Sequence, residues 1–151
     1  MDKNDILKKI APCGLSCETC FAFRDGPVQR YSRLLSESLG NFAARAPRMA
    51  KLLDEPVFNV YPYFKLQLDY FSEVDCAGCR QDNCRLYKAC LVRSCAASHH
   101  VDFCYECTNF PCNDTGFDED LTLRWKHNNY RLKELGAEAY YDATKNSHRY
   151  P

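Results

Sequence analysis

Cysteine is the residue type whose spacing in this chain most clearly indicates chemistry. The chain has 11 cysteines in 151 residues, and eight of them fall between Cys76 and Cys112. Three pairs are separated by two residues, a spacing at which a short turn directs two thiolates toward one tetrahedral metal ion. The sequence therefore predicts metal ligation. The candidate metal ligands are Cys13, Cys17, Cys20, Cys76, Cys79, Cys84, Cys90, Cys95, Cys104, Cys107 and Cys112.

Zinc is the metal that closed sites of four thiolates usually hold, and two such sites would use eight of the cysteines. Spacing allows more than one partition. The local partition groups Cys76, Cys79, Cys84 and Cys90 in one site and Cys95, Cys104, Cys107 and Cys112 in the other. A competing partition pairs Cys17 and Cys20 with Cys104 and Cys107. We expect about two zinc ions, and His99 or His100 could replace a cysteine as a ligand.

The local partition leaves Cys13, Cys17 and Cys20, whose spacing resembles the cluster motif of radical S-adenosylmethionine enzymes. Those enzymes carry an aromatic residue where this chain has Thr19, and they need a larger barrel than this length supplies. These departures favour a structural role for the three cysteines, either a zinc knuckle with Cys13 left over or a third structural cluster, and an iron-sulfur cluster or a redox thiol is the alternative. The favoured function is a zinc-stabilised interaction module; the sequence contains no recognisable catalytic constellation, and whether the protein is an enzyme stays open.

Charge and hydropathy limit the compartment and the partners. Twenty basic and twenty acidic side chains cancel, so no strongly positive field indicates binding to nucleic acid. The first ten residues are charged where a signal peptide is apolar, and no later stretch resembles a membrane span. We expect a cytoplasmic protein that does not bind a membrane. Its binding partner is unknown, and one possible class of partner is another protein. Reduced thiols persist in the cytoplasm, which favours metal ligation over disulfides.

The elements that must position the cysteines are predicted to be helices. Pro27 suits the first turn of a helix that ends near Gly40, and Asp118 is a plausible cap for a helix that ends before Gly136. We expect a mainly α fold with irregular, metal-stabilised cysteine loops, helices flanking a zinc-knuckle segment, and little β structure. The expected single domain, 1–151, contains an N-terminal cysteine motif (13–20), a helical segment (27–74), a cysteine-rich metal-binding segment (76–112) and C-terminal helices (118–145).

Apolar residues recur at helical spacing in two stretches of the chain. One stripe contains Val28, Tyr31, Leu35, Leu39 and Phe42, and a second contains Phe64, Leu68 and Phe71. We expect the second stripe to share one core with Trp125 and Leu132. The alternative for this aromatic-rich stripe is a groove for a ligand or partner.

The succession of cysteine motifs resembles a family of small bacterial and archaeal cysteine-rich proteins of unknown function. The resemblance covers residues 10–113 and a C-terminal piece, 136–141. It rests on the motifs APCGLSCETC (11–20), CAGC (76–79), CLVRSC (90–95), FCYEC (103–107) and FPC (110–112). The resemblance implies zinc binding and no established activity. Many relatives have a cysteine where this chain has Tyr87, so the fourth ligand of the first site stays open.

Overall fold

The computed structural model describes residues 2–81 and 86–150, so the candidate ligand Cys84 lies outside the described residues. The described chain is mainly helical, as predicted, and its β structure is limited to two isolated bridges, Ile10 with Ser16 and Phe23 with Cys76. None of the described helices is long and apolar enough to cross a membrane.

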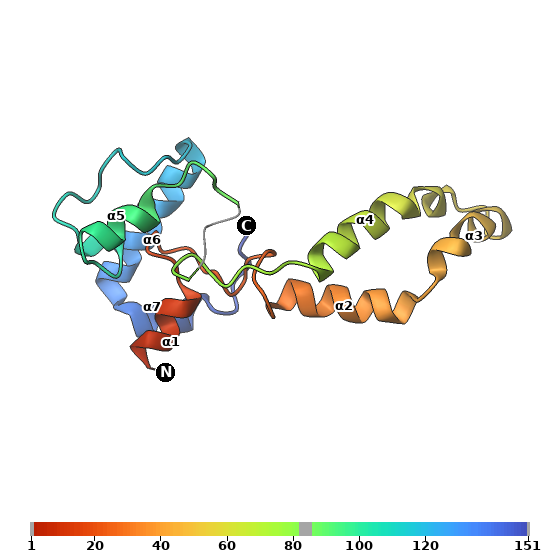
Figure 1. Ribbon diagram of the computed structural model, residues 1–151, viewed down its shortest axis with the longest axis horizontal. Coiled ribbons are helices and arrows are strands. Elements are labelled where there is room, and N and C mark those ends of the chain that lie inside the picture. The colour runs from red at the N-terminus through yellow and green to blue at the C-terminus, as the bar shows by residue number, and fades with distance from the viewer. Residues whose placement is uncertain (1, 82–85, 151) are drawn as a thin grey trace.

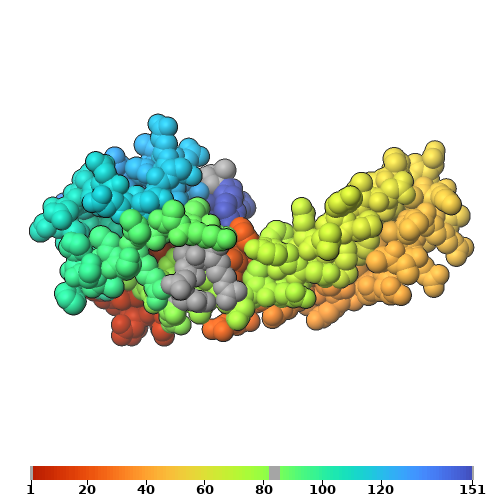
Figure 2. Space-filling model, turned by 45° about the horizontal axis from the view of Figure 1, so that its top comes forward, coloured from red at the N-terminus to blue at the C-terminus, as the bar shows by residue number. Residues whose placement is uncertain are grey.

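Seven α-helices and three short 3-10 helices occur in the described residues. The α-helices are α1 (Lys3–Lys9), α2 (Pro27–Leu39), α3 (Ala46–Leu52), α4 (Tyr61–Ser72), α5 (Val92–Ser98), α6 (Glu119–Leu135) and α7 (Ala137–Thr144). The 3-10 helices are η1 (Phe42–Ala44), η2 (Pro56–Val60) and η3 (Cys104–Glu106). Helices α1, α5, α6 and α7 gather in a body that also holds both ends of the chain, while α2, α3 and α4 form an arm that extends away from it (Figures 1 and 2).

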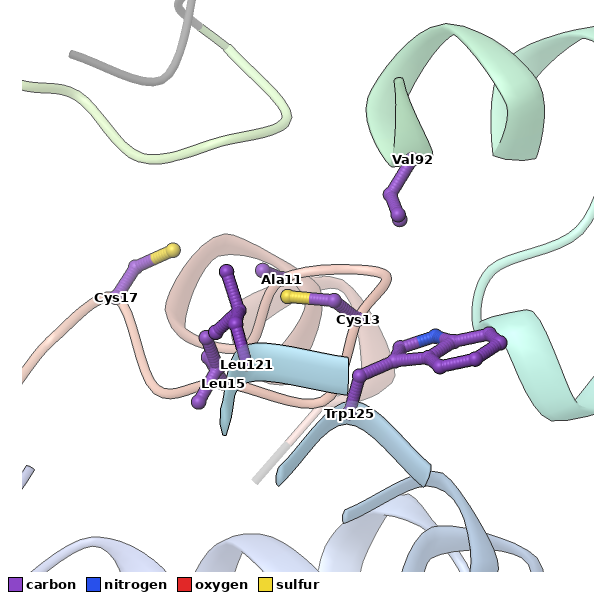
Figure 3. Packing of buried hydrophobic residues seen from close by; sticks show 7 residues of the cluster. All are labelled: Ala11, Cys13, Leu15, Cys17, Val92, Leu121 and Trp125. Carbon is purple, nitrogen blue, oxygen red and sulfur yellow. The ribbon is translucent and has the colours of Figure 1, made fainter. Parts of the chain in front are cut away.

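The body is built around α6. The Asp118 side chain accepts a hydrogen bond from the Leu121 amide at 2.8 Å, which confirms the predicted cap. Trp125 and Leu132, on the inward face of this helix, are fully buried. Trp125 belongs to a cluster with the Cys13 and Cys17 side chains (Figure 3). The cysteine loops therefore pack directly against the central helix.

The arm is a hairpin in which α2 packs along α4. The α2 residues that face α4 are polar: Gln29 is fully buried and its Nε2 donates to the Ser72 carbonyl at 3.2 Å. Two residues of the apolar stripe, Tyr31 and Leu35, are exposed at 66% and 44%, whereas Val28, Leu39 and Phe42 are partly buried. The polar side of α2 therefore makes part of the contact with α4.

The prediction of one core that joins the α4 stripe to Trp125 and Leu132 is wrong. Leu68 is buried within the arm, and Phe64 is 42% exposed. Trp125 and Leu132 belong to two clusters of the body, neither of which contains Phe64, Leu68 or Phe71. The reason is the arm itself, since α4 pairs with α2 and extends away from α6 (Figure 1).

Candidate metal centres

Four cysteines from two distant segments line one small cavity in the body, which we call the first cysteine cavity. They are Cys17, Cys20, Cys76 and Cys79, and the cavity has a volume of about 20 Å³. This grouping differs from both partitions that spacing offered. The pair at 17 and 20 meets the pair at 76 and 79, although the whole arm lies between them in the sequence.

Backbone pairing explains how the two segments meet. Phe23 forms an isolated parallel bridge with Cys76. The Cys76 amide donates to the Ala22 carbonyl at 3.1 Å, and the Arg24 amide donates to the Cys76 carbonyl at 2.9 Å. The chain leaves the body just after this point, passes through the arm, and returns beside the place where it left. The base of the arm thus sets the two cysteine pairs side by side.

Helices α1 and α7 fix the N-terminal cysteine motif from the other side. Lys9 Nζ donates to Glu18 Oε1 at 2.8 Å and to the Tyr141 hydroxyl at 2.8 Å. The Tyr141 hydroxyl donates to Glu18 Oε2 at 2.8 Å, and the Tyr140 hydroxyl donates to the Gly14 carbonyl at 2.8 Å. The residues before and after Cys17 are therefore tied to two helices.

A second small cavity, the second cysteine cavity, has a volume of about 30 Å³. Its cysteines are Cys95, Cys104, Cys107 and Cys112. This is one of the two quartets of the local partition. His99 also lines it, with Nδ1 at 3.7 Å from the Cys95 sulfur and 2.9 Å from the Cys95 carbonyl oxygen. His100 is not among the residues that line this cavity.

The structure separates the three N-terminal cysteines that spacing had grouped. Cys17 and Cys20 face the first cysteine cavity, whereas Cys13 lines a different pocket with Cys79 and Cys90. Burial raises the pKa of the Cys13 thiol to about 12. The buried surroundings of Cys13 therefore favour the thiol over the thiolate.

Each cysteine cavity has a buried N–H group beside it. Arg149 Nε, at the first cavity, makes no hydrogen bond within the described part of the chain, and Trp125 Nε1, at the second, interacts with the Cys104 thiol. A buried donor without a partner costs about 1–3 kcal/mol, and a thiolate sulfur accepts such a bond. Spacing gave no indication of either donor, because both are distant in sequence from most of the cysteines they adjoin.

The donor chemistry fits a metal–thiolate centre, and the size of the cavities limits what they hold. As the side chains stand, no group of three or more His, Cys, Asp or Glu in the described ranges could hold a metal ion. The two volumes correspond to one or two water molecules, which is room for a single ion. Burial raises the pKa of Cys104 to about 11, so thiolate formation there requires a cation to compensate.

The sequence model of one protein family matches residues 9–116, a span that contains every cysteine. That family is described as protein of unknown function, DUF3795. No curated protein and no solved structure matches the chain.

Proposed function

The chain belongs to this family of proteins of unknown function, and from the grouping of its cysteines we propose that it is a zinc-stabilised interaction module. About two zinc ions bind per chain, one at each cysteine cavity. The observation that carries the proposal is that each of two ion-sized cavities is lined by four cysteines beside a buried N–H group. The thiols turn toward the ion when it binds. Because cysteine thiols stay reduced in the cytoplasm, the proposal includes a cytoplasmic location for the protein.

Saturated coordination supports a structural role for the metal. Four thiolates complete the tetrahedral shell of zinc and leave no position for water or substrate, unlike a catalytic zinc site. Trp125 Nε1 and Arg149 Nε then donate to thiolate sulfurs and hold the ligands in place. Zinc at the first cavity joins the N-terminal motif to the base of the arm. The metal thus sets the direction in which the arm leaves the body.

The arm supplies the surface for interaction. Large apolar side chains are exposed along it, and such patches on soluble proteins mark contact sites. They include Tyr31, Leu34, Leu52, Leu53, Val57, Val60, Tyr63, Leu66 and Tyr70. The stretch from Arg30 to Lys51 contains five basic residues and one acidic residue, Glu37. The partner that fits is a protein with an apolar contact surface bordered by carboxylates.

Metal content with an absorption spectrum, measured on anaerobically purified protein, tests the metal part of the proposal. We expect about two zinc ions per chain and no visible absorbance, since zinc has a filled d shell. Less than about one zinc, with iron and visible absorbance in its place, would contradict it. That result would favour the iron-sulfur alternative for Cys13, Cys17 and Cys20.

Photo-crosslinking from the arm tests the interaction part. A crosslinking residue replaces Tyr63, which is 72% exposed, and the captured protein is identified, purified and titrated against the chain. Leu66→Ser should weaken binding at least tenfold, whereas Leu91→Ser, an exposed leucine of the body, should not. Equal affinity of both variants would defeat the proposal. So would adducts formed only with a second copy of this chain or with lipid vesicles.

A further inference from the structure

A second kind of pocket lies beside the N-terminal motif and shares one lining residue, Arg149, with the first cysteine cavity. It is formed by residues 14–19, by α6, and by α7 with the segment that follows it. Its volume is about 410 Å³, within the range of small-molecule sites. We call it the basic pocket. Its basic lining residues are Arg124, His127, Arg131, His148 and Arg149.

The lining carries only one sign of charge. No Asp or Glu is among the described residues that line the basic pocket, although the chain as a whole has equal numbers of acidic and basic residues. Serine and threonine hydroxyls and an asparagine amide make up most of the remaining polar lining. A concave surface with one sign of charge attracts an ion of the opposite sign. The occupant is therefore an anion with several hydrogen-bond acceptors.

Helix geometry brings three of these side chains together. Arg124, His127 and Arg131 lie three and four residues apart on α6, so they project from one face of the helix. The opposite face of α6 carries the buried Trp125 and Leu132. The C-terminal segment then adds His148 and Arg149 across the pocket.

The three arginines keep donors available. Arg124 Nη2 donates to the Arg149 carbonyl at 2.7 Å, and Arg149 Nη1 donates to the Ser16 carbonyl. The Arg131 guanidinium lies over the Tyr140 ring, 5.7 Å from its centroid. Within the described residues none of the three forms an ion pair with a carboxylate. A guanidinium has five N–H donors, so Arg124 and Arg131 keep most of theirs for a ligand.

We propose that the basic pocket binds the dianionic phosphate group of a small molecule. Arginine pairs bind phosphate oxygens through two parallel N–H bonds, and hydroxyls add further donors. The volume of the pocket and the absence of a net positive charge favour a small ligand over the extended backbone of a nucleic acid. Arg149 also lines the first cysteine cavity, whereas Arg124 and Arg131 line neither cysteine cavity, so their substitution separates phosphate binding from metal binding.

Phosphate titration followed by amide NMR tests the proposal. Inorganic phosphate, and separately glycerol phosphate, are added at fixed ionic strength, and shifts are expected at the Gly14 and Asn128 amides, which line the pocket. Arg124→Gln should weaken binding about tenfold, the loss of one hydrogen bond to a charged group. Arg48→Gln, an exposed charge on the arm, should leave it unchanged.

Arg131 needs a second variant because its guanidinium packs on Tyr140. Arg131→Lys keeps the charge but loses the planar fork, and should also weaken binding while a thermal melt shows a folded protein. Two results would overturn the proposal. One is a phosphate affinity that is equal in the wild type, Arg124→Gln and Arg131→Lys, or no binding at all. The other is binding to a single-stranded RNA that falls with Arg48→Gln, which would assign the charges to a nucleic-acid surface.

Discussion

Alanine at Gly14 is expected to destabilise the body more than alanine at Gly136, although both glycines have similar positive φ angles, 81° and 77°. Positive φ costs an L residue about 1–2 kcal/mol, and at Gly136 the extended ψ of 161° raises this backbone cost to about 1–3 kcal/mol. The difference comes from space. A Cβ at Gly14 would lie 2.8 Å from the Asn128 Cβ and 3.2 Å from Leu132 Cδ1, both carried by α6, whereas a Cβ at Gly136 meets nothing within 4 Å.

Forcing α6 away from Gly14 adds about 1–3 kcal/mol of overpacking. We therefore expect a loss of about 4 kcal/mol in the free energy of unfolding for Gly14→Ala and about 2 kcal/mol for Gly136→Ala. Urea unfolding, with zinc added in excess to both variants, is followed by the fluorescence of the single, fully buried Trp125 and measures both losses. Equal losses would refute the reasoning, because they would show that the close approach of α6 to the N-terminal motif does not exist in solution.

Three further results are expected. Burial raises the pKa of Tyr140 to about 12, so the contribution of its hydroxyl to stability is complete below the unfolded pKa of about 10 and is lost as the pH rises from there toward 12. Tyr140→Phe should remove that part of the pH dependence of the free energy of unfolding. An unchanged pH profile would contradict this. Leu132→Ala should cost about 3 kcal/mol and Leu123→Ala, at a 61% exposed site, under about 0.5 kcal/mol, in the same urea assay. Chelation of the metal should increase amide hydrogen exchange in the cysteine segment, 76–112, before it does so in the arm, 27–72, which contains no cysteine. A uniform loss of protection would contradict this, because it would show that the two segments unfold as one cooperative unit.

Local patterns predicted the parts of the molecule that are local in space. The proline at position 27 and the cap at Asp118 placed the starts of α2 and α6 correctly, because capping and the first helical turn depend on neighbouring residues. The quartet that lines the second cysteine cavity was among the predicted groupings, since short loops connect its members. In these cases sequence distance and spatial distance agree.

The parts that depend on long-range contacts were not predictable from one sequence. Spacing alone could not show that Cys20 would meet Cys76, because the contact depends on the hairpin of α2 and α4 returning the chain to its starting point. Periodicity showed that Tyr31 and Leu35 share a face of α2, but not that this face is exposed. A pattern shows which residues lie together on a helix, and the tertiary structure decides what covers them.

The zinc count of paired cysteine variants, measured by native mass spectrometry, tests the central claim most directly. If Cys20 and Cys76 bind the same ion, then Cys20→Ser, Cys76→Ser and the double variant should each keep about one of about two zinc ions. Cys20→Ser combined with Cys107→Ser should lose both, and Cys13→Ser should lose neither. Loss of both ions from the Cys20→Ser/Cys76→Ser double variant would contradict the account, because it would place these two cysteines in different sites.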